Sequence, residues 1–130
     1  ARNLNAQDDG SFAGPYARML QPVSPHYKGK VAVLTGPACM SSTEAFVLMM
    51  RAAGAILVGE PTQGSSGNPK PHTLANGVTA YIPSWRSLPP DGDPIEGAGI
   101  QPDVLITVPT DVDDPAQDPV LEAALKAVRG

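Results

Sequence analysis

Short apolar runs separated by turn residues organise the middle of the chain. Residues 31–34 and 55–58 are continuous apolar runs, which are typical of strands buried on both faces of a parallel sheet. Between them, Ser41 and Glu44 form a capping-box pattern and Gly54 is a natural helix end, so the spacing predicts a helix that is apolar on most sides. Strand, helix and strand within residues 31–58 predict a right-handed βαβ unit with parallel strands.

The same patterns outline the rest of the chain. Asn76-Gly77 between residues 72–74 and 78–82 predicts a hairpin, and residues 104–106 predict one more strand. Residues 118–130 predict a final helix, because an aspartate at the cap precedes a proline at the first helical position. We expect residues 1–29 to form an irregular opening segment with at most a helical turn at 17–20, and 83–99 to form a long loop. The fold class is α/β.

Composition and charge argue against several classes of function. The 130 residues suit one domain, and the formal net charge is −4, with nine of the 13 acidic residues in 91–130 and no basic stripe, which argues against nucleic-acid binding. The longest uninterrupted apolar run, 45–50, falls far short of the ~20 residues that span a bilayer. One cysteine forms no internal disulfide, and with two histidines it makes a four-ligand zinc site improbable. No leader peptide is visible, and the missing initiator methionine suggests a processed product or an excised piece.

The turn before the predicted helix is the first place to look for chemistry. A phosphate-binding loop needs a glycine and then a lysine where Ser41 and Ser42 stand, so nucleotide binding is disfavoured. A serine at a strand-to-helix turn suits a nucleophile, because backbone N–H groups at the helix N-terminus can stabilise an oxyanion. Ser41 is also a candidate N-cap, and this stretch alone favours the cap over the nucleophile, because capping serines vastly outnumber catalytic ones. The G-x-S-x-G elbow is absent, since Met40 precedes Ser41 and Thr43 follows Ser42.

Six short motifs then occur in a characteristic order. They are YKGKVAVLT at 27–35, SSTE at 41–44, VGEPT at 58–62, GSSG at 64–67, GIQPD at 99–103 and DPVLE at 118–122. Together they resemble the tail-specific, or C-terminal-processing, serine protease family, which includes the tricorn core and retinoid-binding repeats. The resemblance covers about residues 27–129. It implies a ββα superhelix of the crotonase and Clp protease type with a largely parallel sheet, and it makes 30–130 the C-terminal part of a serine peptidase core.

The resemblance also implies site residues. Ser41 matches the nucleophile, and the backbone N–H of Ser42 would be one oxyanion donor. One branch of the family uses a lysine within the 64–67 loop, where this chain has serines. The tricorn-like branch uses a histidine oriented by a glutamate, and Glu96 stands at the glutamate position. That histidine, and a second oxyanion turn, come from an upstream region in the family.

Other reactive residues have plainer interpretations. The two histidines, His26 and His72, do not match the family's base and are expected on the surface. Lys70 is expected to be a solvated strand residue, and Cys39 a small apolar filler. The acidic run 111–114 lacks the spacing of a calcium loop. Trp85 could line a substrate groove or cap the core from a loop.

These observations lead to one hypothesis and one rival. We expect a serine endopeptidase of the tail-specific type that acts on polypeptides without metal or cofactor. Its partners would be the polypeptide substrate and the upstream half of its own core, and family habit suggests an extracytoplasmic location. The isolated chain should then be inactive. The alternative is a non-catalytic ligand- or peptide-binding module on the same fold, in which Ser41 is only a cap.

Overall fold

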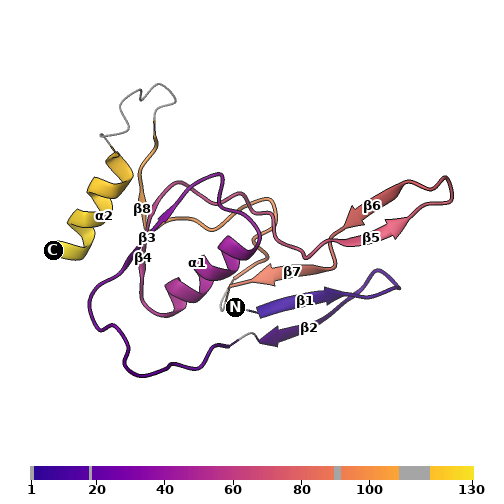
Figure 1. The fold of residues 1–130 in the computed structure, drawn as a ribbon, viewed down its shortest axis with the longest axis horizontal. Helices are drawn as coiled ribbons and strands as arrows, with labels where there is room; N and C mark the ends of the chain where they lie inside the picture. Colours follow the sequence, from indigo (N-terminus) through magenta and orange to yellow (C-terminus); the bar gives the residue numbers. More distant parts are fainter. Residues whose placement is uncertain (1, 18, 90–91, 109–117) are drawn as a thin grey trace.

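The architecture is built from short strands in three small sheets and from helices, as expected for the α/β class. The computed structural model describes residues 2–17, 19–89, 92–108 and 118–130 (Figure 1). Along the chain these residues form β1 (Arg2–Ala6), β2 (Phe12–Ala17), β3 (Ala32–Thr35), α1 (Ser42–Ala52), β4 (Ile56–Gly59), β5 (Lys70–Thr73), β6 (Thr79–Ile82), β7 (Trp85–Leu88), β8 (Val104–Leu105) and α2 (Pro119–Arg129).

The parallel sheet is the centre of the fold. β3 pairs in parallel with β4, with Ala32 opposite Ile56, and β4 pairs in parallel with β8. This arrangement confirms the predicted βαβ unit, including its parallel strands. α1 and α2 lie on either side of the sheet (Figure 1). Leu57 and Val58 of β4 are both fully buried, because successive strand residues point to opposite faces and a helix contacts each face.

The hydrophobic core lies between α1 and this sheet. Val47 and Leu48 of α1 pack against Leu57 of β4, and Ile95 and Ile100 close the cluster from the segment that precedes β8. The core therefore fixes α1 against β3 and β4 and brings the 95–100 segment alongside. The candidate site is assembled from these same elements.

The prediction for residues 1–29 was wrong in its secondary structure. β1 and β2 form an antiparallel pair, and β1 also pairs with β7, which lies within the stretch 83–99 predicted to be a loop. Strand β1, with the sequence RNLNA, carries no alternating apolar pattern that would predict a strand, and its partner β7 lies 80 to 86 positions away. No helical turn forms at the described residues of 17–20. The predicted parallel sheet is present as β3–β4–β8, but the chain as described is mixed, since the β2–β1–β7 and β5–β6 sheets are antiparallel.

The remaining predicted elements are confirmed. β5 and β6 form the hairpin around Asn76-Gly77 and project from the body of the molecule (Figure 1). Asp118 caps α2, with one carboxylate oxygen accepting from the N–H groups of Val120 and Leu121 at 3.0 and 2.9 Å. The acidic run 111–114 lies outside the described residues. Among the residues described, no helix has the length and apolar character needed to cross a bilayer.

Candidate active site

Ser41 occupies a strained turn between β3 and α1. It is solvent-exposed, and its backbone has φ 55° and ψ −119°, a conformation that non-glycine residues rarely adopt. Such a conformation costs about 1–3 kcal/mol and persists only where the surroundings enforce it. A strained strand-to-helix turn that presents a serine hydroxyl is the geometry of a nucleophile elbow. Ser41 has this geometry without the G-x-S-x-G motif that usually signals it.

The structure supports only in part the prediction that the Ser41 side chain caps the N-terminus of α1. Glu44 closes its half of the capping box, since Oε2 accepts a hydrogen bond from the backbone N–H of Ser41 at 3.1 Å. The Ser41 hydroxyl itself makes no well-formed hydrogen bond to the first turn of α1. Both side chains are placed as in a capping box, but only the Glu44 contact has the geometry of a hydrogen bond, and Ser41 itself is exposed to solvent.

Glu44 holds the loops around Ser41 in place. Its carboxylate is fully buried and accepts four hydrogen bonds. Oε1 accepts from the Thr62 hydroxyl at 2.6 Å and from the Gly64 N–H at 2.7 Å, and Oε2 accepts from the Ser65 and Ser41 N–H groups at 3.0 and 3.1 Å. A buried charge is tolerable only when its oxygens are satisfied in this way. Sequence reasoning identified Glu44 only as a capping residue.

Further hydrogen bonds tie the same loops together. The Thr62 hydroxyl also accepts from the N–H of Ile100 at 2.8 Å, which joins the 62–65 loop to the segment carrying Glu96. The Ser41 N–H is shared with the carbonyl of Ser65 at 2.8 Å, and the Gln63 N–H donates to the carbonyl of Cys39 at 2.9 Å. These contacts over-determine the turn and explain how its strained backbone is maintained.

The backbone N–H of Ser42 is available to a ligand. Thr43 and Glu44 donate their N–H groups to carbonyls of residues 40 and 41, whereas the Ser42 N–H has no acceptor among the described residues. Ser42 is the first residue of α1, where the helix dipole adds positive potential. An anionic oxygen formed beside the Ser41 hydroxyl would therefore meet a donor and a favourable field.

Glu96 lies next to the 64–67 loop, on which Ser66 stands. Its Oε1 accepts from the Ser66 hydroxyl at 2.7 Å and from the Ser87 N–H at 2.8 Å. Its Oε2 is buried and has no partner within the described part of the chain. Glu96 is therefore hydrogen-bonded to the 64–67 loop. That loop in turn contacts Ser41 through its backbone, because the Ser41 N–H donates to the carbonyl of Ser65. Sequence reasoning missed Ser66 and Ser87, and only the doubled serine of the GSSG motif hinted at a role for the first.

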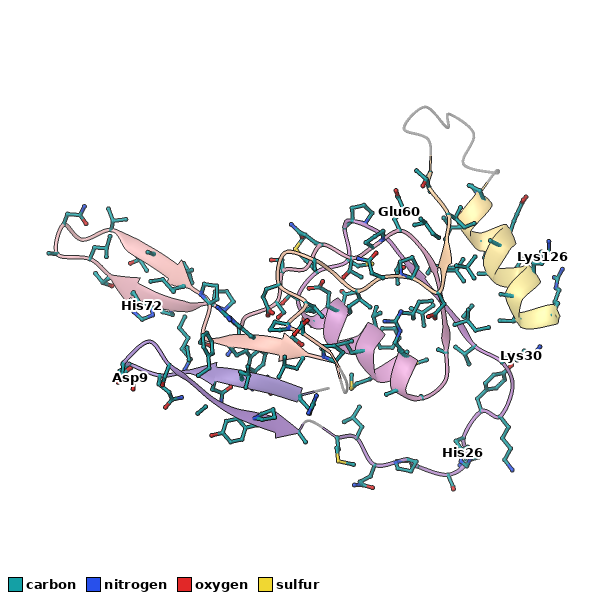
Figure 2. The ribbon with its side chains drawn as sticks, turned by 180° about the vertical axis from the view of Figure 1, so that it is seen from behind. Asp9, His26, Lys30, Glu60, His72 and Lys126 are labelled. Carbon is teal, nitrogen blue, oxygen red and sulfur yellow. The ribbon has the colours of Figure 1, made fainter. Side chains whose placement is uncertain are left out.

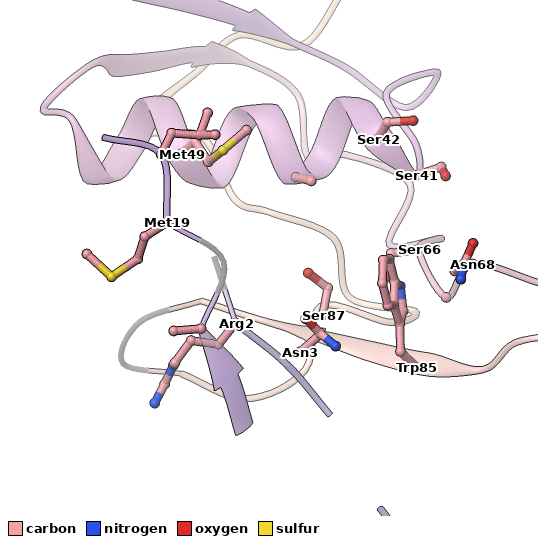
Figure 3. Close-up of a pocket in the computed structure, with 14 residues that line it drawn as sticks. Arg2, Asn3, Met19, Ser41, Ser42, Met49, Ser66, Asn68, Trp85 and Ser87 are labelled. Carbon is pink, nitrogen blue, oxygen red and sulfur yellow. The ribbon is translucent and has the colours of Figure 1, made fainter. Parts of the chain in front are cut away.

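A groove of about 740 Å³ opens beside these residues. Figure 3 shows Ser41, Ser42 and Ser66 at one end, with Met19 and Met49 at the other. Trp85 also lines the groove, but from strand β7 rather than from a loop. Its other lining residues include Arg2, Asn3, Ala17, Leu20, Ala45, Gly67, Asn68 and Ser87. Polar groups therefore gather around the candidate nucleophile, and an apolar stripe continues along α1.

The remaining candidates lie away from the groove. His72 lies on the projecting β5 strand and His26 on the long connection to β3, and both are exposed (Figure 2). Lys70 is also exposed on β5. Cys39 is half-buried, and its backbone, not its thiol, supports the site. The described residues that line the groove include neither a histidine nor a lysine.

Comparison with known proteins identifies the family. The model of peptidase family S41 matches residues 2–106, so the chain belongs to this family of peptidases. The match confirms the family resemblance, covers five of the six motifs and extends the likeness towards the N-terminus to residue 2, whereas the motif at 118–122 lies beyond it. No protein with curated annotation is significantly similar in sequence.

Solved structures share the fold. A protein from Parabacteroides merdae ATCC 43184 that carries a provisional peptidase assignment is 25% identical with a TM-score of 0.85, covering 99% of this chain and 42% of its own. Mature CPAF in complex with lactacystin is 20% identical with a TM-score of 0.65, covering 74% and 20%. The photosystem II D1 C-terminal processing protease is 22% identical with a TM-score of 0.55, covering 99% and 32%. The chain thus spans about two-fifths of the first of these proteins and less of the others.

Proposed function

We propose that this chain supplies the nucleophile-bearing, C-terminal part of a serine peptidase core of the tail-specific type. Ser41 attacks the carbonyl carbon of a peptide bond, and the Ser42 N–H stabilises the resulting oxyanion. A histidine from outside this chain takes the Ser41 proton and returns it to the leaving amine, and water then hydrolyses the acyl-enzyme. Glu96 orients that histidine and stabilises its charged form. The substrate is a polypeptide.

The observation that carries this proposal is the strained conformation of Ser41. A turn selected only for stability would place glycine at φ 55°, because glycine adopts it without strain. Here a serine is held there by the buried carboxylate of Glu44, which accepts from its backbone N–H, and the serine hydroxyl forms no capping hydrogen bond of its own. Strain that is enforced at an exposed hydroxyl, beside an unpartnered N–H, is the expected signature of a pre-organised nucleophile.

The family relationship supports two further points of the proposal. The chain covers 42% of the P. merdae protein, which is consistent with an upstream half that completes the core and supplies the base. We also propose that the βαβ unit is one part of the ββα superhelix of crotonase-like proteins. Residues 30–130 then form the C-terminal part of the catalytic core, and β1 and β2 join it through β7.

A non-catalytic binding module is the second candidate. The specific observation in its favour is that the described residues lining the groove include no histidine or lysine that could act as a base beside Ser41. The apolar stripe from Met19 to Met49 would then bind an apolar ligand. In that case Ser41 would be inert towards serine-directed reagents in every form of the protein.

The test compares the full-length parent protein, its Ser41→Ala variant and the isolated chain. We expect the parent to cleave casein or a peptide library and to be labelled by a fluorophosphonate probe, and Ser41→Ala to lose both properties. The isolated chain should show no turnover, because a serine without a positioned base is a weak nucleophile and losing one oxyanion donor alone costs ~10²–10³ in rate. An inactive, unlabelled parent would favour the binding module. Turnover by the isolated chain that persists in Ser41→Ala would refute both the site and the missing-half argument.

A further inference from the structure

Ser66 stands between Glu96 and the groove. Its hydroxyl donates to Glu96 Oε1 at 2.7 Å, and Ser66 itself lines the groove beside Ser41 (Figure 3). Glu96 is not among the groove-lining residues. A group that enters the groove therefore meets the hydroxyl of Ser66 before it meets the carboxylate.

The orientation of the Glu96 carboxylate also places the Ser66 hydroxyl between Glu96 and the groove. Oε1 is held by two donors, the Ser66 hydroxyl and the Ser87 N–H at 2.8 Å, whereas Oε2 is turned into the protein and buried. With Oε1 engaged and Oε2 enclosed, the carboxylate presents no oxygen directly to the groove. Its charge can still act there through the polarised O–H bond of Ser66.

We propose that Ser66 is a positioning residue that connects Glu96 to the general base. A hydroxyl donates one hydrogen bond and accepts others, so Ser66 can donate to Glu96 and accept the ring N–H of the imidazole. This inference rests on the proposed function, because it needs an imidazole in the groove. In the branch of the family with a lysine in this loop, the loop supplies the base, whereas here it would support a base from elsewhere.

The proposed link between Glu96 and the base predicts the direction in which the pH profile of kcat/KM moves when Ser66 loses its hydroxyl. If Glu96 stabilises the protonated imidazole through Ser66, removing the hydroxyl weakens that stabilisation and lowers the pKa of the base. The acidic limb of the kcat/KM profile, which reports the base of the free enzyme, then moves to lower pH. If Glu96 instead touched the imidazole directly, loss of the Ser66 donor would make the carboxylate a stronger acceptor and move the limb to higher pH. A purely structural hydroxyl would leave the limb in place.

The experiment measures pH profiles of kcat/KM in the full-length parent protein. We expect Ser66→Ala to lower kcat/KM by up to about 10²-fold, the scale of a misplaced catalytic group, and to shift the acidic limb to lower pH. Ser66→Thr keeps the hydroxyl and should restore both the rate and the limb. The matched control is Ser84→Ala, which removes a hydroxyl that donates to the backbone carbonyls of Asn68 at 2.8 Å and Gly67 at 3.4 Å and to no carboxylate of the described residues. This control should leave the profile unchanged.

The outcomes separate this inference from the proposed function. An unchanged limb, or a limb moved to higher pH, in Ser66→Ala would overturn the connecting role while Ser41→Ala remained inactive. Should Ser66→Ala fail to fold, Ser66→Cys replaces it, because a thiol is a weak donor of similar shape and must shift the limb in the same direction. If Ser41→Ala kept the wild-type rate, the proposed function would fail, and the role of Ser66 would fail with it.

Discussion

Replacing Glu44 by glutamine tests whether the buried carboxylate holds the site together. Each carboxylate oxygen accepts two hydrogen bonds: an amide NH₂ in place of Oε2 faces two backbone N–H donors, and in place of Oε1 it faces the Gly64 N–H, because the Thr62 hydroxyl can turn to accept. Hydrogen bonds to a charged group contribute about 1.5–3 kcal/mol each, and losing one or two predicts a destabilisation of about 1.5–6 kcal/mol. That is a large share of the ~5–15 kcal/mol by which proteins are stable.

Urea unfolding followed by the fluorescence of the single tryptophan, Trp85, measures this change. The control is Glu60→Gln, because the Glu60 side chain is only partly buried and makes no hydrogen bond to any described residue. We expect the control to change the free energy of unfolding by less than about 0.5 kcal/mol. A Glu44→Gln protein within about 1 kcal/mol of the wild type would refute the reasoning, since four hydrogen bonds to one carboxylate could not then be sustaining the loops.

Three further substitutions probe the same region by urea unfolding. Ser41→Gly should raise the free energy of unfolding by about 1 kcal/mol, because glycine removes about 1–3 kcal/mol of backbone strain and adds a smaller unfolded-state entropy. Thr62→Val should lower it by about 2–4 kcal/mol, because Glu44 loses a donor and the Ile100 N–H loses its acceptor. Gly99→Ala should lower it by about 3 kcal/mol or more, because φ is +69° and the new methyl group would overlap the Thr62 carbonyl oxygen.

Each of these substitutions has a matched control. Ser41→Ala keeps the Cβ atom and should not stabilise the protein, so equal stabilities of the alanine and glycine variants would argue against strain. Thr73→Val lies on the exposed strand β5 and should change the stability by less than about 0.5 kcal/mol. Gly77→Ala, at φ +82° in open space, should cost only backbone strain, about 1 kcal/mol. A Gly99→Ala protein as stable as Gly77→Ala would contradict the close packing of Gly99.

Local patterns in the sequence predicted the βαβ unit, the β5–β6 hairpin, β8 and α2 correctly. Each of these elements depends on neighbouring residues, as with the apolar run of β4 or the aspartate cap of α2. The β2–β1–β7 sheet was missed, and in it β1 pairs both with the neighbouring β2 and with β7, 80 to 86 residues further along the chain. Its polar sequence, with only Asn3 buried, carries no periodic signal.

The sequence by itself determined the family, the position of Ser41 at a strand-to-helix turn, and the pairing of that serine with a helix acid three residues later. The order of short motifs was sufficient for this, since each motif is local. Only the tertiary structure decided that Ser41 has a strained backbone, that Glu44 is a buried acceptor of four hydrogen bonds, and that Glu96 is joined to Ser66. These properties depend on contacts between residues 18 to 30 positions apart, such as Glu44 with Thr62 and Ser66 with Glu96. Loops of irregular backbone make those contacts, and their paths follow from packing of the whole core rather than from any local pattern.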